Sequence, residues 1–212
     1  GKLNAKGILF DLDGTLLDTR DVYIEAANIA FKATGQQPPE KAQALEIPKR
    51  MEQKQSIVDI ANYDPKEFLQ VYLKAFYTVS ASKIKPFPNI NAALETLSQR
   101  AKFAVITMRF MPGSLVLKEL KQFQLDGYFA HVVTGLDTQK PKPSPEALIK
   151  AGRCLGVPLD ECVIIGDSVI DVQAGKAAGV KTVSVLSGLY SKPELERTQP
   201  DYIINDVTEL PQ

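Results

Sequence analysis

The sequence has 212 residues, of which 44% are hydrophobic, so the chain can bury a sizeable core and shows no compositional sign of disorder. Its 25 Lys and Arg residues balance 25 Asp and Glu residues, which leaves no net field to attract nucleic acid or an anionic membrane. The apolar runs are shorter than a bilayer span, and the opening "GKLNAKGILF" does not have the pattern of a signal peptide. We therefore expect a soluble cytoplasmic protein, a monomer or homodimer, with no nucleic acid or membrane as partner.

Apolar runs that are typical of strands buried in a parallel sheet recur along the chain. The candidate strands are 7–10, 103–107, 129–133, 162–165, 180–185 and 202–204. Helical patterns separate most of them, at 90–100, 114–123, 144–155 and 171–178. This alternation predicts an α/β fold with a Rossmann-like parallel sheet and right-handed crossovers.

A stretch without strands, residues 18–82, interrupts the alternation directly after the first candidate strand. It contains helical patterns near 19–34, 48–61 and 65–81 and a weaker one near 39–45. The two prolines of "KIKPFPNI" mark the return to the sheet. We predict a core formed by residues 1–17 and 83–212, with a small helical domain of residues 18–82 inserted after the first strand.

Two sets of residues are interpreted as structural. Aromatic residues recur at helical spacing in the last helix of the insert and are expected to form its core: Phe68, Tyr72, Phe76 and Tyr77. Cys154 and Cys162 are expected to be a pair of buried thiols, because one His and no further Cys are present to complete a metal site.

Reactive side chains follow three of the candidate strands. They are Asp11 and Asp13 after the first strand, Thr107 at the end of "FAVIT", and Asp167 and Asp171 after "VIIG". The loop before the helix at 144–155 adds Lys140 and Lys142. Ligands of open parallel sheets bind at the carboxyl ends of the strands, so these segments predict a single site.

The first two aspartates suggest a metal. Asp11 and Asp13 are two residues apart in an extended stretch, so their side chains face the same way. Their charges would repel unless a cation lay between them, and Mg²⁺ prefers such oxygen ligands. Asp167 is a natural further ligand, and Asp171 could hold a metal-bound water or a neighbouring Lys. A calcium loop is excluded, because its fifth and sixth positions would be Thr and Leu.

Each segment has a simpler interpretation when it is taken alone. "DLDG" and "GDS" are typical of turns and helix caps, and "KPKPSPE" is typical of a polyproline spacer before a helix. In order, however, "FDLDGTLLD", "VIT", "KPKPSPE" and "IIGDSVID" resemble the four motifs of the haloacid dehalogenase-like hydrolase superfamily, most closely its phosphoglycolate phosphatase-like branch. The resemblance covers nearly the whole core, and the helical insert stands where that branch carries its cap domain.

The resemblance implies a Mg²⁺-dependent phosphatase that hydrolyses a small, phosphoglycolate-like phosphomonoester. Asp11 would be the nucleophile that forms an aspartyl-phosphate, and Asp13 would act as acid and then as base. The Mg²⁺ would be held by the Asp11 carboxylate, the Asp13 carbonyl, Asp167 and Asp171. Within the superfamily an acid at the position of Asp13 argues for an oxygen leaving group, because a halide needs no proton.

The resemblance also implies a group of phosphate-binding residues, namely Thr107, the Met108 amide and Lys142. Both Lys140 and Lys142 fit Lys-Pro-x-Pro; we choose Lys142, because Pro-Glu and the helix follow it in the register of the branch. Where the branch commonly has Asn-Lys, this chain has Met108 and Arg109. The role of Arg109 is left open between a surface salt bridge and a substrate contact.

The substrate and two alternative functions stay open. In the insert, Arg20 and Arg50 are candidate contacts for the substrate, although most such cations are simply solvated. A phosphosugar mutase of the same fold would use the same residues, with Asp13 passing a proton between sugar hydroxyls. A non-catalytic phosphate-binding regulatory module is disfavoured, because all four motifs retain their chemical groups.

Overall fold

The computed structural model describes residues 4–210, apart from the side chain of Ala81. The described chain folds into two compact units, one formed by the residues up to 17 and from 86 onward and the other by residues 18–85. Residues 1–3 and 211–212, which the sequence assigns to the core, lie outside the described residues. The return to the first unit falls after Lys85, whereas the sequence places it after residue 82.

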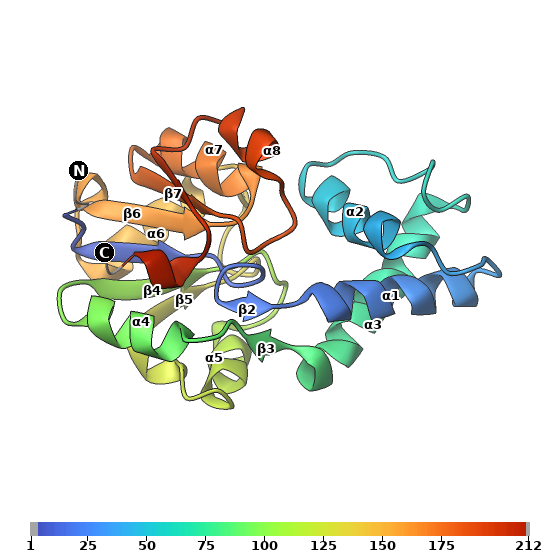
Figure 1. The fold of residues 1–212 in the computed structure, drawn as a ribbon, viewed down its shortest axis with the longest axis horizontal. Coiled ribbons are helices and arrows are strands. Elements are labelled where there is room, and N and C mark those ends of the chain that lie inside the picture. Colours follow the sequence, from blue (N-terminus) through green and yellow to red (C-terminus); the bar gives the residue numbers. More distant parts are fainter. Residues whose placement is uncertain (1–3, 211–212) are drawn as a thin grey trace. The chain divides into compact units, whose positions relative to one another are not determined.

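The first unit is built on a six-stranded parallel sheet (Figure 1). Its strands are β1 (Gly7–Phe10), β4 (Lys102–Ile106), β5 (Phe129–Val133), β6 (Cys162–Gly166), β7 (Lys181–Val185) and β8 (Tyr202–Ile204), in the spatial order β5-β4-β1-β6-β7-β8. Every residue of β1 and β6 is buried, which explains why these strands are continuous apolar runs. The predicted strands are confirmed, with both ends of β4 and one end each of β6 and β7 shifted by one residue.

Helices connect the strands of this unit (Figure 1). They are α4 (Ile90–Ser98), α5 (Gly113–Lys121), α6 (Glu146–Leu155), α7 (Val169–Ala178) and α8 (Lys192–Glu196), with short 3₁₀ turns at Asp126–Tyr128, Leu159–Glu161 and Val207–Glu209. Helices α6 and α7 pack on each other and on the sheet. Leu148 and Leu155 of α6 share one apolar cluster with Leu9, Ile106 and Ile164 of the central strands. The predicted α/β class with a Rossmann-like parallel sheet is confirmed.

The prediction of two buried thiols is wrong for one of them. Cys162 begins β6 and is buried, whereas Cys154 on α6 is exposed. The buried side of α6 includes Ala151 and Leu155, and Cys154 lies off this apolar stripe. The position of a residue around a helix therefore decided its exposure.

The second unit consists of three helices, α1 (Arg20–Ala33), α2 (Lys41–Glu52) and α3 (Pro65–Lys83). Aromatic rings join α1 to α3: Phe31 meets Phe68 edge-on with ring centroids 5.2 Å apart, and Tyr23 stacks on Phe76 at 5.3 Å. Phe68, Tyr72 and Phe76 are buried. The predicted aromatic core of the insert is therefore confirmed for these three residues.

The helices predicted near 39–45 and 48–61 are one helix, α2, and the predicted helix is wrong for residues 53–61. Helix α2 contains Pro48 in its interior and ends at Glu52. After α2 the chain turns, and the amides of Ile60 and Ala61 both donate to the carbonyl oxygen of Ile57 at 2.9 Å. Ile57 and Ala61 are buried, so an apolar pair spaced by four residues is satisfied here by a turn.

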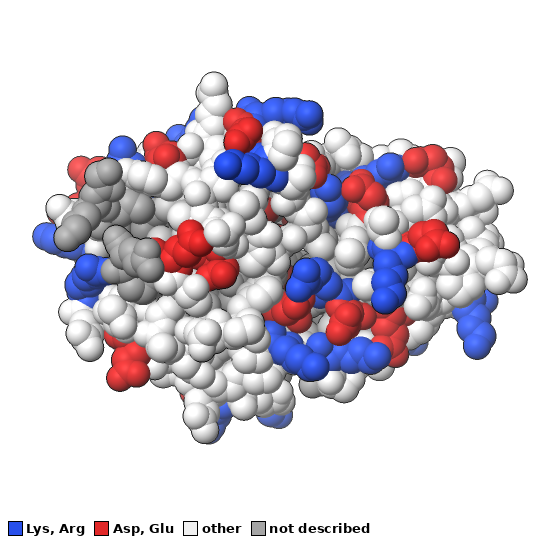
Figure 2. All heavy atoms as spheres, in the orientation of Figure 1, with Lys and Arg blue, Asp and Glu red and all other residues white. Residues whose placement is uncertain are grey.

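Two strands of two residues each, β2 (Leu17–Asp18) and β3 (Lys85–Pro86), pair where the chain passes between the units, and the sequence did not predict them. On the visible face of the molecule acidic and basic side chains are interspersed, in keeping with the balanced composition (Figure 2). Among residues 4–210, the helices are all too short or too polar to cross a bilayer.

Candidate active site

Three neighbouring strands of the sheet end in polar residues. Asp11 follows β1, Thr107 follows β4 and Asp167 follows β6, and these strands are adjacent in the order β4-β1-β6. Hydrogen bonding continues past the strand ends, because the amide of Asp11 donates to the carbonyl oxygen of Ile165 at 2.9 Å. The structure thus brings these three side chains to the carboxyl edge of the sheet, where parallel sheets bind their ligands.

The loop after β1 separates its acidic residues from its apolar ones. Leu12 is fully buried, whereas its neighbours Asp11 and Asp13 are half-buried, as alternation in an extended chain requires. Gly14 has a φ of +84°, and a Cβ atom there would lie 2.4 Å from Oδ2 of Asp167. This turn therefore depends on a glycine for its backbone and for the space beside Asp167.

A buried lysine reaches the predicted nucleophile. Nζ of Lys142 donates to Oδ1 of Asp11 at 3.1 Å and to Oδ1 of Asp171 at 2.6 Å, and its side chain is 3% exposed. Burial disfavours the ammonium, but the charges of Asp11 and Asp171 outweigh it and raise the pKa of Lys142 above its ordinary value. Lys140, the other lysine of the motif, is exposed. The structure thus brings Lys142 and not Lys140 to Asp11.

Asp171 has two functions at the start of α7. Its Oδ2 accepts from the amide of Ser168 at 3.1 Å, which closes a capping box with the Ser168 side chain. Its Oδ1 accepts from Lys142. Of the two expectations for Asp171, a metal-bound water or a lysine, the structure shows the lysine.

Three carboxylates of this edge could hold a metal ion. Oxygen atoms of Asp11, Asp167 and Asp171 lie within 4.8 Å of one another. Asp167 is held by the Thr15 hydroxyl, which donates to its Oδ1 at 3.2 Å. A Cβ atom at Gly188 would lie 2.0 Å from Oδ2 of Asp167, so glycine keeps the space beside this oxygen open. A set of three carboxylates in such a cradle fits a hard divalent cation such as Mg²⁺.

Asp13 pairs with a residue whose role the sequence left open. Nε and Nη2 of Arg109 donate to the two carboxylate oxygens of Asp13 at 2.9 and 2.6 Å. Nη1 of Arg109 donates to Oε2 of Glu119 on α5 at 2.5 Å. Arg109 is 4% exposed, so of the two alternatives left open for it the surface salt bridge is wrong. Sequence reasoning missed Glu119, because nothing local connects a mid-helix Glu with Asp13.

The predicted phosphate-binding residues of β4 lie directly after the strand. Thr107 is buried, its amide donates to the carbonyl oxygen of Val133 at 2.9 Å, and its hydroxyl accepts from the amide of Arg109 at 3.1 Å. Met108 follows and is half-buried. Their contacts with phosphoryl oxygens stay a prediction.

The two arginines predicted in the insert are engaged by carboxylates of the second unit. Nε and Nη2 of Arg20 donate to Asp18 at 3.0 and 2.8 Å. Arg50 pairs with Asp59, and its Nε lies 3.7 Å from Oε2 of Glu46. Their role as substrate contacts stays a prediction.

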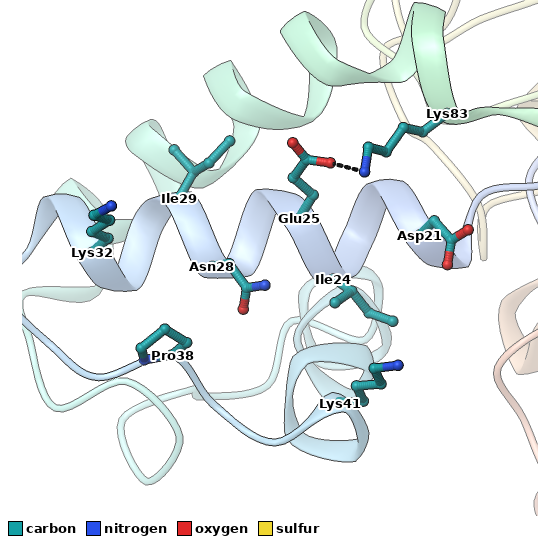
Figure 3. Close-up of a pocket in the computed structure, with 9 residues that line it drawn as sticks. All are labelled: Asp21, Ile24, Glu25, Asn28, Ile29, Lys32, Pro38, Lys41 and Lys83. Atoms are coloured by element: carbon teal, nitrogen blue, oxygen red, sulfur yellow. Dashed lines mark ion pairs between the residues drawn. The ribbon is translucent and has the colours of Figure 1, made fainter.

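A separate hollow of about 560 Å³ lies within the second unit. Figure 3 shows its lining residues, which include Lys83 and Glu25, an ion pair at 2.6 Å. None of the residues that the sequence predicted for the site lines this hollow.

The sheet is Rossmann-like and carries aspartates and a buried lysine at its carboxyl edge. This is the architecture expected of the superfamily that the sequence motifs resemble. The family model of haloacid dehalogenase-like hydrolases matches residues 8–185 of the chain. The chain belongs to this family, and its similarity to the phosphoglycolate phosphatase-like branch is confirmed.

Similar proteins extend over nearly the full length of the chain. A relative from Aquifex aeolicus named phosphoglycolate phosphatase is 31% identical over 207 residues, which are 96% of this chain and 93% of that protein. A relative from Halalkalibacterium halodurans named pyrophosphatase PpaX is 28% identical over 209 residues, 96% of this chain and 94% of that protein. A solved haloacid dehalogenase-like hydrolase from Bacteroides fragilis has a TM-score of 0.83 and 25% identity, and covers 97% of this chain and 99% of its own.

Proposed function

We propose that this protein is a Mg²⁺-dependent cytoplasmic phosphatase that hydrolyses a small, phosphoglycolate-like phosphomonoester through an aspartyl-phosphate. The observation that carries the proposal is the buried Lys142, whose Nζ lies 3.1 Å from Oδ1 of Asp11 in a site that also holds Asp13 and Asp167. The relative named phosphoglycolate phosphatase supports this reaction class.

In the proposed reaction the Asp11 carboxylate attacks phosphorus in line, and the bond from phosphorus to the leaving oxygen breaks. Asp13 gives its proton to that oxygen and later takes a proton from the water that hydrolyses the aspartyl-phosphate. Lys142 holds Asp11 in place and offsets negative charge on the phosphoryl group, helped by Thr107 and the Met108 amide.

The residues that would hold Mg²⁺ are Asp11 and Asp167 through their carboxylates, Asp13 through its carbonyl oxygen, and Asp171 in support. When it is bound, the ion supplies positive charge that lets an anionic carboxylate approach an anionic phosphate ester. The carboxylate cluster and the space kept open by Gly188 support this assignment.

A second candidate is the hydrolysis of pyrophosphate, favoured by the relative named pyrophosphatase. The leaving group would then be phosphate instead of an alcohol, with the same nucleophile. A screen of about a hundred phosphorylated metabolites that includes pyrophosphate and phosphoglycolate would decide between these substrates, and isomerised sugar from a hexose phosphate would identify a mutase instead.

The test of the mechanism is the variant Asp11→Asn, which keeps the size of the side chain and removes the nucleophile. We expect it to abolish phosphate release from 4-nitrophenyl phosphate, and we expect a chelator to abolish release by the wild type until Mg²⁺ is restored. Equal rates for Asp11→Asn and wild type would refute the proposed mechanism.

A further inference from the structure

A buried chain of ion pairs joins Asp13 to α5. One guanidinium, that of Arg109, binds Asp13 through Nε and Nη2 at 2.9 and 2.6 Å and binds Glu119 through Nη1 at 2.5 Å. The side chain of Arg109 is 3% exposed, and those of Asp13 and Glu119 are 14% and 13% exposed. Water therefore screens these contacts little, and two charge-assisted hydrogen bonds fix the plane of the Asp13 carboxylate.

Arg109 is itself held in place, both at its backbone and at the tip of its side chain. At the backbone, the amide of Arg109 donates to the Thr107 hydroxyl at 3.1 Å, and its carbonyl oxygen accepts from the amide of Gly135 at 3.0 Å. At the other end Glu119 restrains Nη1. A planar guanidinium whose backbone and Nη1 are both held in place can impose one orientation on the carboxylate that it binds.

The charges of the cluster argue against a direct role in binding the phosphoryl group. Two carboxylates face one guanidinium, so no positive charge is left over to attract an anion. An ionised carboxylate offers about four acceptor sites, and the fork of Arg109 occupies one on each oxygen of Asp13. One of the remaining sites can carry the proton that Asp13 gives to the leaving oxygen, and once vacated the same site can accept a proton from the attacking water.

We propose that Arg109, anchored by Glu119, is a positioning residue that fixes the orientation of the Asp13 carboxylate for its proton transfers. This inference rests on the proposed function, in which Asp13 moves a proton to the leaving oxygen and from the attacking water. Neither Arg109 nor Glu119 touches the phosphoryl group in this assignment; both act through Asp13.

The effect of an Arg109 variant on substrates with different leaving groups tests whether Arg109 acts through Asp13. The value of kcat/KM reports the first chemical step, in which an alkoxide needs a proton and 2,4-dinitrophenolate does not. Arg109→Lys keeps the charge beside Glu119 and loses the fork. We expect it to lower kcat/KM for an alkyl phosphate by about 10- to 100-fold and for 2,4-dinitrophenyl phosphate by less than about 3-fold.

A second variant, Glu119→Gln, keeps the test valid if Arg109→Lys fails to fold. Burial raises the pKa of Glu119 above its ordinary value, so an amide of the same size should be tolerated there. Glu119→Gln should therefore fold and show a smaller loss with the same dependence on the leaving group. Arg153→Lys, at an exposed position of α6, is the matched control and should leave both substrates unaffected. Thermal melts verify that each variant is folded.

Coupling with Asp13 completes the test. If Arg109 acts through Asp13, adding Arg109→Lys to Asp13→Asn should cause no further loss for the alkyl phosphate. Equal losses for the two substrates, or losses that multiply in the double variant, would overturn the positioning role and leave the phosphatase intact. Hydrolysis that persists in Asp11→Asn would overturn the proposed function and this inference with it.

Discussion

Replacing Lys142 by Met removes one buried positive charge and nearly keeps the length of the side chain. The ammonium lies 3.1 Å from Oδ1 of Asp11 and 2.6 Å from Oδ1 of Asp171, and the side chains of Lys142 and Asp171 are 3% and 2% exposed. The variant therefore leaves two neighbouring carboxylates without their shared cation, one of them almost fully buried.

The magnitude follows from this geometry. At an effective dielectric constant of about 20, contacts of this length have Coulomb energies of about 5–6 kcal/mol each, but desolvation of the three groups offsets most of this energy. Removal of one partner from a buried ion pair costs about 3–5 kcal/mol. We expect a loss of about 4 kcal/mol in the free energy of unfolding, which lowers Tm by about 8–16 °C for a chain of this size. Loss of charge stabilisation should lower kcat by at least about 100-fold.

The assay combines thermal melts in chelator, where no added cation can compensate Asp11 and Asp171, with phosphate release in Mg²⁺. Lys140→Met is the matched control, because Lys140 belongs to the same motif but is exposed. It should change neither Tm nor kcat appreciably. A Lys142→Met protein with wild-type Tm and kcat, or a Lys140→Met protein with the larger losses, would refute this reasoning.

Two further predictions follow from glycine geometry and from thiol burial. Gly14→Ala should cost about 3 kcal/mol of stability and most of the activity, because the new Cβ meets Asp167 at 2.4 Å in a left-handed turn. Gly179→Ala, also at positive φ but with nothing within 4 Å, should cost only about 1 kcal/mol and keep its activity, and denaturant titrations of both variants measure these losses of stability. Burial raises the pKa of Cys162 to about 11, so at pH 8 a thiol reagent should modify only the exposed Cys154 in the native protein and both thiols after unfolding. Rapid native labelling of Cys162, located by peptide mass, would contradict the burial.

Local patterns sufficed for most of the sheet. Strands β1 and β6 are buried on both faces, so each is a continuous apolar run that is visible without any knowledge of its partners. The capping box of α7 likewise depends only on neighbouring residues, because Ser168 and Asp171 are three residues apart, which is the spacing that this motif requires. Prediction failed where a local pattern has two physical solutions, as at Ile57 and Ala61, which a turn buries as well as a helix would.

The candidate site divides in the same way. Its acidic residues could be predicted because they follow strands whose carboxyl ends must meet at one edge. The partners of these acids could not be derived from spacing, because the contacts join residues far apart in the chain: Lys142 lies 131 positions from Asp11, and Arg109 lies 96 positions from Asp13. Lys142 was predicted only through the family resemblance, and the pairing of Arg109 with Asp13 was not predicted. Periodicity and capping act over a few residues, whereas a buried ion pair depends on how whole elements pack.

By itself, the sequence determined the class of the fold, the order of its strands along the chain and the aspartates at their ends, because burial and alternation act on neighbouring residues. Only the tertiary structure decided that one ammonium, that of Lys142, meets both Asp11 and Asp171, that Arg109 is buried between Asp13 and Glu119, and that Cys154 faces solvent. Desolvation is the physical reason. A charge can be buried only where opposite charges and hydrogen-bond partners surround it, and these partners come from elements that lie far apart in the chain and meet only in the folded protein.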